Sequence, residues 1–112
     1  MAGGNTYPKS LRLRKNSEFR AVFLHGQRYV CGSISVFALK EKEKKIGISV
    51  SSKKLRKAVE RNRVKRILRE IVRKEKNSIP NNLHLVFLYN KREVPTYAEI
   101  HKDVKYLFQK LQ

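Results

Sequence analysis

The sequence predicts an α+β fold, a two-layer sandwich in which a small mixed sheet of about four strands packs against three helices. Segments rich in β-branched residues predict strands at 29–39, 46–51 and 83–89. Apolar residues recur at helical spacing within 16–25, 56–76 and 97–111. The expected element order is α-β-β-β-α-β-α, with the first strand segment split in two. A chain of 112 residues suits one domain, residues 1–112, with a single modest core.

The N-terminal part of the chain predicts a flexible arm followed by a short helix. Residues 1–15 contain two adjacent glycines, a proline and several basic residues, a composition that disfavours regular structure. Asn16 is a good N-cap residue, and Glu18 would lie in the first turn, facing the positive end of the helix dipole. Gly26 supplies a stop signal. We therefore expect a helix at 16–25.

The strands are predicted from alternation and from apolar runs. Residues 29–39 predict a strand with a break near Gly32, and residues 40–45 form a charged turn. The alternation within 46–50 then predicts a second strand, paired with the first as a hairpin. The run 83–89 is almost continuously apolar, as expected for a strand buried on both faces.

Two longer helices complete the expected fold. The first spans about 56–76 and carries one apolar stripe, formed by Val64, Ile67, Leu68, Ile71 and Val72. The second follows Pro95, where Thr96 and Glu99 have the spacing of a capping box. Its apolar positions are Tyr97, Ile100, Val104, Leu107, Phe108 and Leu111.

The charge of the chain is strongly unbalanced. It has 27 Lys and Arg against 9 Asp and Glu, a net charge of +18. Such a surface favours a polyanionic partner, and nucleic acid is the usual one, with an acidic membrane as the alternative. No apolar run approaches the roughly 20 residues that span a bilayer. No apolar segment typical of a signal peptide follows the first methionine. We therefore expect a cytoplasmic protein that does not act at a membrane.

The sequence shows no pattern typical of a catalytic or metal-binding site. Cys31 is the only cysteine, and the three histidines are scattered without ligand spacing. No paired carboxylates with the spacing of a metal site are evident. We therefore expect neither a metal site nor catalytic residues in the chain itself.

Residues 53–76 carry the most informative pattern. They hold twelve basic residues against three acidic ones, and so half of the net charge of +18. Advancing about 100° per residue from Val64 places the apolar stripe near 20° and a polar row between about 100° and 200°. This row consists of Asn62, Lys65, Arg66, Arg69 and Arg73. It could be a merely solvated face, but such faces usually mix signs in i,i+4 pairs, and this row contains no acid. Its arginines suit phosphate oxygens.

These residues also resemble a known family. The segment 53–70 resembles the RNR motif of the bacterial ribonuclease P protein component family. The matching residues are Lys53-Lys54, Ala58-Val59, Arg61-Asn62-Arg63-Val64-Lys65-Arg66 and Leu68-Arg69-Glu70. The likeness covers about residues 11–111. It includes Leu13-Arg14-Lys15-Asn16 with Phe19, Phe23 and Gly26, the segment Gly47-Ile48-Ser49-Val50-Ser51, and the closing helix. Arg56-Lys57 stands where many members carry a glycine.

The resemblance implies a protein subunit that binds a catalytic RNA. In that family the RNA subunit, with bound Mg²⁺, removes the 5′ leader of precursor tRNA. The implied partners are therefore the ribonuclease P RNA subunit and precursor tRNA, without DNA or membrane. The implied RNA contacts are Lys53, Lys54, Arg61, Asn62, Arg63, Lys65, Arg66 and Arg69.

The resemblance also implies a cleft between the first helix and the sheet that holds the single-stranded leader. The matching residues are Arg12, Lys15, Phe19, Phe23 and Phe37. Unpaired bases stack on aromatic rings without strong sequence preference. The residues alone leave an alternative open, because Phe19 and Phe23 have the spacing of ordinary core residues. The family fold further implies a left-handed crossover from strand 46–51 to strand 83–89, although most such crossovers are right-handed.

Other functions remain compatible with the composition. A ribosomal or other structural RNA-binding protein would also be small and basic. A DNA-binding regulator is disfavoured because no helix-turn-helix pattern is present. A nuclease that needs no RNA is the enzymatic alternative, and cleavage by the purified chain would indicate it.

Overall fold

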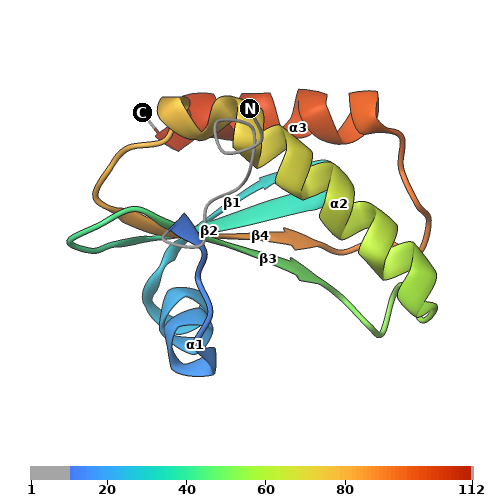
Figure 1. The fold of residues 1–112 in the computed structure, drawn as a ribbon, viewed down its shortest axis with the longest axis horizontal. Helices are drawn as coiled ribbons and strands as arrows, with labels where there is room; N and C mark the ends of the chain where they lie inside the picture. The colour runs from blue at the N-terminus through green and yellow to red at the C-terminus, as the bar shows by residue number, and fades with distance from the viewer. Residues whose placement is uncertain (1–10, 112) are drawn as a thin grey trace, which may run out of the picture.

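The computed structural model describes residues 11–111, and it confirms the predicted α+β class and element order (Figure 1). The elements are α1 (Asn16–His25), β1 (Gln27–Cys31), β2 (Ile34–Lys40), β3 (Lys45–Val50), α2 (Ala58–Glu75), a 3₁₀ turn (Lys76–Ser78), β4 (Leu83–Tyr89) and α3 (Tyr97–Leu111).

The four strands form one mixed sheet in the order β1-β2-β4-β3. Strand β4 runs antiparallel to β2 and parallel to β3. The hairpin predicted between residues 29–39 and 46–50 is therefore wrong, because β4 lies between the two strands. The most apolar strand takes the most buried place in the sheet. Alternation within 46–50 identifies a strand but says nothing about its neighbour.

The hairpin of this sheet joins β1 to β2 instead. Cys31 pairs with Ile34 across a turn in which Gly32 adopts φ 57°. Only glycine adopts this conformation without strain. The break predicted near Gly32 is thus confirmed.

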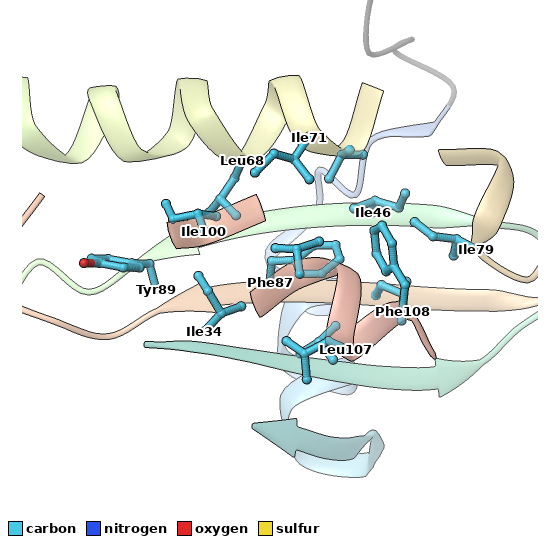
Figure 2. Close-up of a cluster of buried hydrophobic side chains, with 14 of the residues drawn as sticks. Ile34, Ile46, Leu68, Ile71, Ile79, Phe87, Tyr89, Ile100, Leu107 and Phe108 are labelled. Carbon is cyan, nitrogen blue, oxygen red and sulfur yellow. The ribbon is translucent and has the colours of Figure 1, made fainter. Parts of the chain in front are cut away.

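Helices cover both faces of the sheet. Helix α2 packs across β3, and α3 packs across β1 and β2 on the same face, while α1 lies against β2 and β4 on the opposite face (Figure 1). The main core lies between the sheet and the α2–α3 pair, with Phe87 of β4 among side chains of both helices (Figure 2). A smaller cluster under α1 contains Leu13, Val22 and Val86.

Residues 11–15 do not form the flexible arm that the sequence predicts. Arg12 forms a parallel bridge with Ile46 of β3, and the Leu13 N–H donates to the Ile46 carbonyl at 3.0 Å. Leu13 is buried. Backbone pairing and burial of one leucine therefore hold this stretch against the edge of the sheet. Residues 1–10, the rest of the predicted arm, lie outside the described residues.

The helix ends differ slightly from the prediction. The N-cap of α1 is Lys15 rather than Asn16, and the Lys15 N–H donates to the Glu18 carboxylate at 3.3 Å. Asn16 is therefore the first residue of the helix rather than its cap. The capping box of α3 is confirmed: the Glu99 N–H donates to the Thr96 hydroxyl at 3.2 Å, and the Thr96 N–H donates to the Glu99 carboxylate at 3.2 Å.

Helix α2 connects two parallel strands that are direct neighbours, β3 and β4. This is the crossover expected from the resemblance, and its left-handed sense stays a prediction. None of the helices within residues 11–111 has the length and apolarity needed to cross a membrane.

Candidate nucleic-acid interface

Helix α2 presents two faces of opposite character. Val64, Leu68, Ile71 and Val72 are buried against the sheet and α3, and Ile67 is half-buried. This burial fixes the rotation of the helix, so that positions on the other side of the wheel must face solvent. The apolar stripe predicted from the sequence is confirmed.

The outward side of α2 carries a cluster of polar and basic residues that we call the α2 ridge. Its members are Asn62, Arg63, Lys65, Arg66 and Arg69. All are exposed except Lys65, which is half-buried. Within residues 11–111 none of the four basic side chains has an ion-pair or hydrogen-bond partner. Val59, Asn62, Arg63 and Arg66 line a hollow of about 290 Å³ on this surface. Unpaired cations around a hollow are suited to an anionic ligand.

Arg73 does not belong to the ridge, although the helical wheel places it in the same row. It forms a bidentate ion pair with Glu70, and Lys74 lies 3.7 Å from the same carboxylate. Hydrogen bonding from Arg73 lowers the pKa of Glu70 below its ordinary value. Residues three positions apart are neighbours on a helix surface, and this spacing lets Glu70 contact Arg73.

Arg61 turns back toward the chain that precedes α2. Its Nη1 donates to the carbonyls of Leu55 and Arg56, each at 2.8 Å. The side chain is half-buried. Arg61 therefore braces the loop between β3 and α2, a contact that the spacing of the motif does not reveal.

Lys53 and Lys54 lie in that loop, at residues 51–57, rather than on the helix. Both are exposed, and both line a cavity that also includes Arg92 from the loop after β4. Sequence reasoning missed Arg92, because a lone arginine in a loop has no pattern around it.

The residues predicted for the leader cleft lie around α1, and they are packed to different degrees. Phe19 is half-buried, and its ring lies over Gly47 of β3. Phe23 is 37% exposed, and it meets Phe37 of β2 edge to face, with ring centroids 4.9 Å apart. Core packing and an open aromatic surface therefore coexist here, with Phe19 closer to the core and Phe23 closer to solvent.

Two basic groups flank this aromatic cluster. The Arg28 guanidinium of β1 lies 5.7 Å from the centroid of the Phe37 ring, and sequence reasoning did not single it out. Arg12 lines a small pocket of about 110 Å³ together with Phe19 and Arg69. The α2 ridge and the aromatic cluster thus approach each other at the edge of β3. Lys15 is exposed at the start of α1, outside this pocket.

No group of three His, Cys, Asp or Glu side chains in the described part of the chain is arranged to hold a metal ion. The Cys31 thiol lies 3.5 Å from a carboxylate oxygen of Asp103, far from the α2 ridge in sequence. Burial, together with Asp103, raises the pKa of this thiol above its ordinary value.

Comparison with known proteins identifies the family. The family model described as Ribonuclease P matches residues 7–112. The ribonuclease P protein component of an Exiguobacterium species is 36% identical over 104 residues, which cover 91% of this chain and 90% of the relative. That of Finegoldia magna is 38% identical over 104 residues and covers 91% of each chain.

Solved structures agree with the sequence relatives. The ribonuclease P protein from Thermotoga maritima is 27% identical, with a TM-score of 0.79, and covers 90% of this chain and 97% of its own. The Staphylococcus aureus protein, 24% identical, has the same fold with a TM-score of 0.80 over 91% of this chain and 95% of its own. The fold, the motif on α2 and these relatives agree, and the chain belongs to the ribonuclease P protein family.

Proposed function

We propose that this chain is the protein subunit of ribonuclease P. It binds the catalytic RNA subunit and the 5′ leader of precursor tRNA, and so promotes endonucleolytic removal of the leader in the cytoplasm. The observation that carries the proposal is the α2 ridge, a set of basic side chains without partners among residues 11–111.

The arrangement of the ridge supports binding to a folded RNA. Arg66 and Arg69 lie on one helix face, one turn apart, and each guanidinium offers a planar fork that matches two phosphate oxygens. The helix is anchored by its buried side, so that these groups are presented on a rigid surface. Arg61 contributes by bracing the adjoining loop.

In this proposal the chemistry belongs to the RNA. Mg²⁺ bound by the RNA subunit supports hydrolysis of the phosphodiester bond, and the protein contributes binding and orientation. The chain is therefore one subunit of an endoribonuclease, and alone it is expected to be inactive.

The leader is proposed to bind beside α1. Phe23 and Phe37 offer aromatic faces for unpaired bases, and Arg28 lies over the Phe37 ring. Arg12, beside Phe19, and Lys15, at the start of α1, add further positive charge on the chain next to this helix. Base stacking on such rings contributes about 1–3 kcal/mol per base and is tolerant of sequence. That tolerance suits an enzyme that processes many different leaders.

Reconstitution tests the proposal. The purified chain is added to a bacterial ribonuclease P RNA at low Mg²⁺ concentration, and removal of the 5′ leader is followed on gels. The wild-type chain should restore cleavage, whereas Arg63→Glu with Arg66→Glu should weaken RNA-subunit binding by about tenfold or more in filter binding.

A matched control reverses two lysines of α3, Lys102→Glu with Lys105→Glu. Both are exposed and have the same i,i+3 spacing as the ridge pair. The control should bind the RNA subunit almost as well as wild type. Equal losses for the two double variants would contradict a specific role of the ridge.

Co-purification with ribosomal subunits instead of precursor-processing RNA would favour a ribosomal protein.

The leader contact is tested separately with Phe23→Ala. This exposed ring can be removed with little effect on the main core, and the variant should lose affinity for precursor tRNA more than for mature tRNA. Leu24→Ala is the control, because Leu24 is the next residue of α1 and is 70% exposed. Equal affinities of Phe23→Ala and wild type for the precursor would overturn the proposed leader site.

A further inference from the structure

A basic cavity of about 410 Å³ lies at one end of the sheet, separate from the α2 ridge. It is formed where the carboxyl ends of the parallel strands β3 and β4 meet. The loop 51–57 follows β3, and the loop 90–96 follows β4. Ligand sites of sheets with parallel strands commonly lie at this end. The lining residues are Lys53, Lys54, Arg56, Lys57, Glu60 and Arg92.

The charges around this cavity are strongly unbalanced. Five of the six lining residues are basic, and Glu60 is the only acid among them. In the part of the chain that the structure describes, none of the five cations forms an ion pair. Like charges gathered around one hollow repel each other, and this repulsion is relieved when an anion enters.

The loop that supplies four of these cations is held firmly. Leu55, in its middle, is only 1% exposed and belongs to the main core. The side chain of Arg61 donates to the Leu55 and Arg56 carbonyls, and the Leu55 N–H donates to the Ser51 carbonyl at 3.0 Å. The basic groups on this loop are therefore arranged before any ligand arrives, which lowers the entropic cost of binding.

The loop that carries Arg92 is tied to the same part of the molecule. The buried Tyr89 hydroxyl donates to the Glu93 carbonyl at 2.6 Å. The Tyr89 carbonyl in turn accepts from the Ser51 N–H at 3.2 Å, which links the two loops at their bases. Arg92 thus lines the same cavity as Arg56, from a loop distant in sequence.

We propose that this cavity binds a phosphodiester group of RNA, with Arg92 and Arg56 contacting it from opposite loops. The proposal rests on the proposed function. The family resemblance already implies Lys53 and Lys54 as RNA contacts, and the inference adds Arg56 and Arg92 as a phosphate-binding pair in the same cavity. The cavity shares no lining residue with the hollow of the α2 ridge. Two separate contacts on one rigid body would define how the protein is oriented on the RNA, which a single row of cations cannot do.

The test compares Arg92→Gln with Lys102→Gln, and RNA-subunit affinity is measured at several salt concentrations. Each variant removes one exposed cation, and Lys102 lies on α3, outside the cavity. Arg92→Gln should bind about three- to tenfold more weakly than wild type, and its plot of log affinity against log salt should be shallower by about one. Lys102→Gln should match wild type in both respects.

A double-mutant cycle then tests whether the two loops share one phosphate group. Arg56→Gln and Arg92→Gln together should cost less than the sum of the single losses, because either change alone disrupts the shared contact. Arg66→Gln and Arg92→Gln should be additive, since Arg66 lies on the ridge. An Arg92→Gln variant that behaves like Lys102→Gln, or additivity of the Arg56 and Arg92 losses, would overturn the inference. Failure of the wild-type chain to bind the RNA subunit would instead overturn the proposed function.

Discussion

At the scale of single residues, Gly47 shows how closely α1 approaches the sheet. A Cβ atom at this position would lie 2.6 Å from the Phe19 ring and 3.2 Å from the Leu13 Cβ. The absence of a side chain therefore lets the Phe19 ring rest directly on β3. The sequence shows only alternation at 46–50, so this requirement for glycine becomes visible only with the structure.

Gly47→Ala should therefore lower the free energy of unfolding by about 1–3 kcal/mol, because the Phe19 ring must move. Chemical denaturation measures the change. Ser49→Ala, two residues further on the same face of β3, is the control and should have little effect. If the two variants prove equally stable, Phe19 is not confined by Gly47.

The carboxylate of Glu99 should make the stability of the fold depend on pH. Hydrogen bonds from the backbone and hydroxyl of Thr96 lower the pKa of Glu99 below its ordinary value of 4.5. Since the folded-state pKa is lower than the unfolded-state value, this stabilisation is complete above the ordinary carboxyl range. It is lost as pH falls through the folded-state pKa.

We therefore expect wild type to exceed Glu99→Gln in stability at neutral pH, with the difference shrinking in acid. Thermal unfolding at a series of pH values would show it. Glu60→Gln, which removes a carboxylate without a hydrogen-bond partner among residues 11–111, serves as the comparison. A constant difference between wild type and Glu99→Gln at all pH values would contradict the assignment.

At the scale of elements, α2 was predicted well because its periodicity is strong. The wheel correctly separated the buried stripe from the basic side, and the observed helix begins and ends within two residues of the expected bounds. The periodicity does not show which groups each arginine of α2 contacts. Arg73 forms an ion pair with Glu70, and Arg61 donates hydrogen bonds to the carbonyls of residues 55 and 56. Both depend on rotamers and loop geometry, which a helical wheel does not contain.

Arg61→Gln should therefore destabilise the fold, by about 1–2 kcal/mol, as two carbonyl contacts of a charged donor are lost. Arg63→Gln, which removes an exposed arginine two positions away, should change stability by less than about 0.5 kcal/mol. Denaturation midpoints of the two variants provide the comparison. Equal midpoints would mean that Arg61 does not brace the loop.

At the scale of the whole molecule, the net charge of +18 bears on the proposed binding to RNA, which should release counterions from the phosphates. Affinity for the RNA subunit should fall steeply with salt, and a plot of log affinity against log salt should be linear. Filter binding at several salt concentrations measures the slope. A flat plot would show that phosphate contacts do not dominate the interaction.

Within residues 11–111, the sequence predicted the three α-helices and the four strands, but not the order of the strands in the sheet. Local patterns identified 46–50 and 83–89 as strands, yet they do not show that β3 pairs with β4 rather than with β2. The same limit applies to Arg92, which becomes a candidate contact only because β3 and β4 are neighbours. Local sequence patterns therefore could not predict which segments distant in sequence lie next to each other in the fold.

The central place of β4 has a consequence for how the chain is made. On the ribosome, β1, β2 and β3 emerge before β4, which alone connects β2 to β3. Until residues 83–89 have left the exit tunnel, the nascent sheet lacks its middle, and the loops after β3 and β4 cannot meet. A chain that lacks β4 should therefore be unable to assemble the basic cavity that these two loops form.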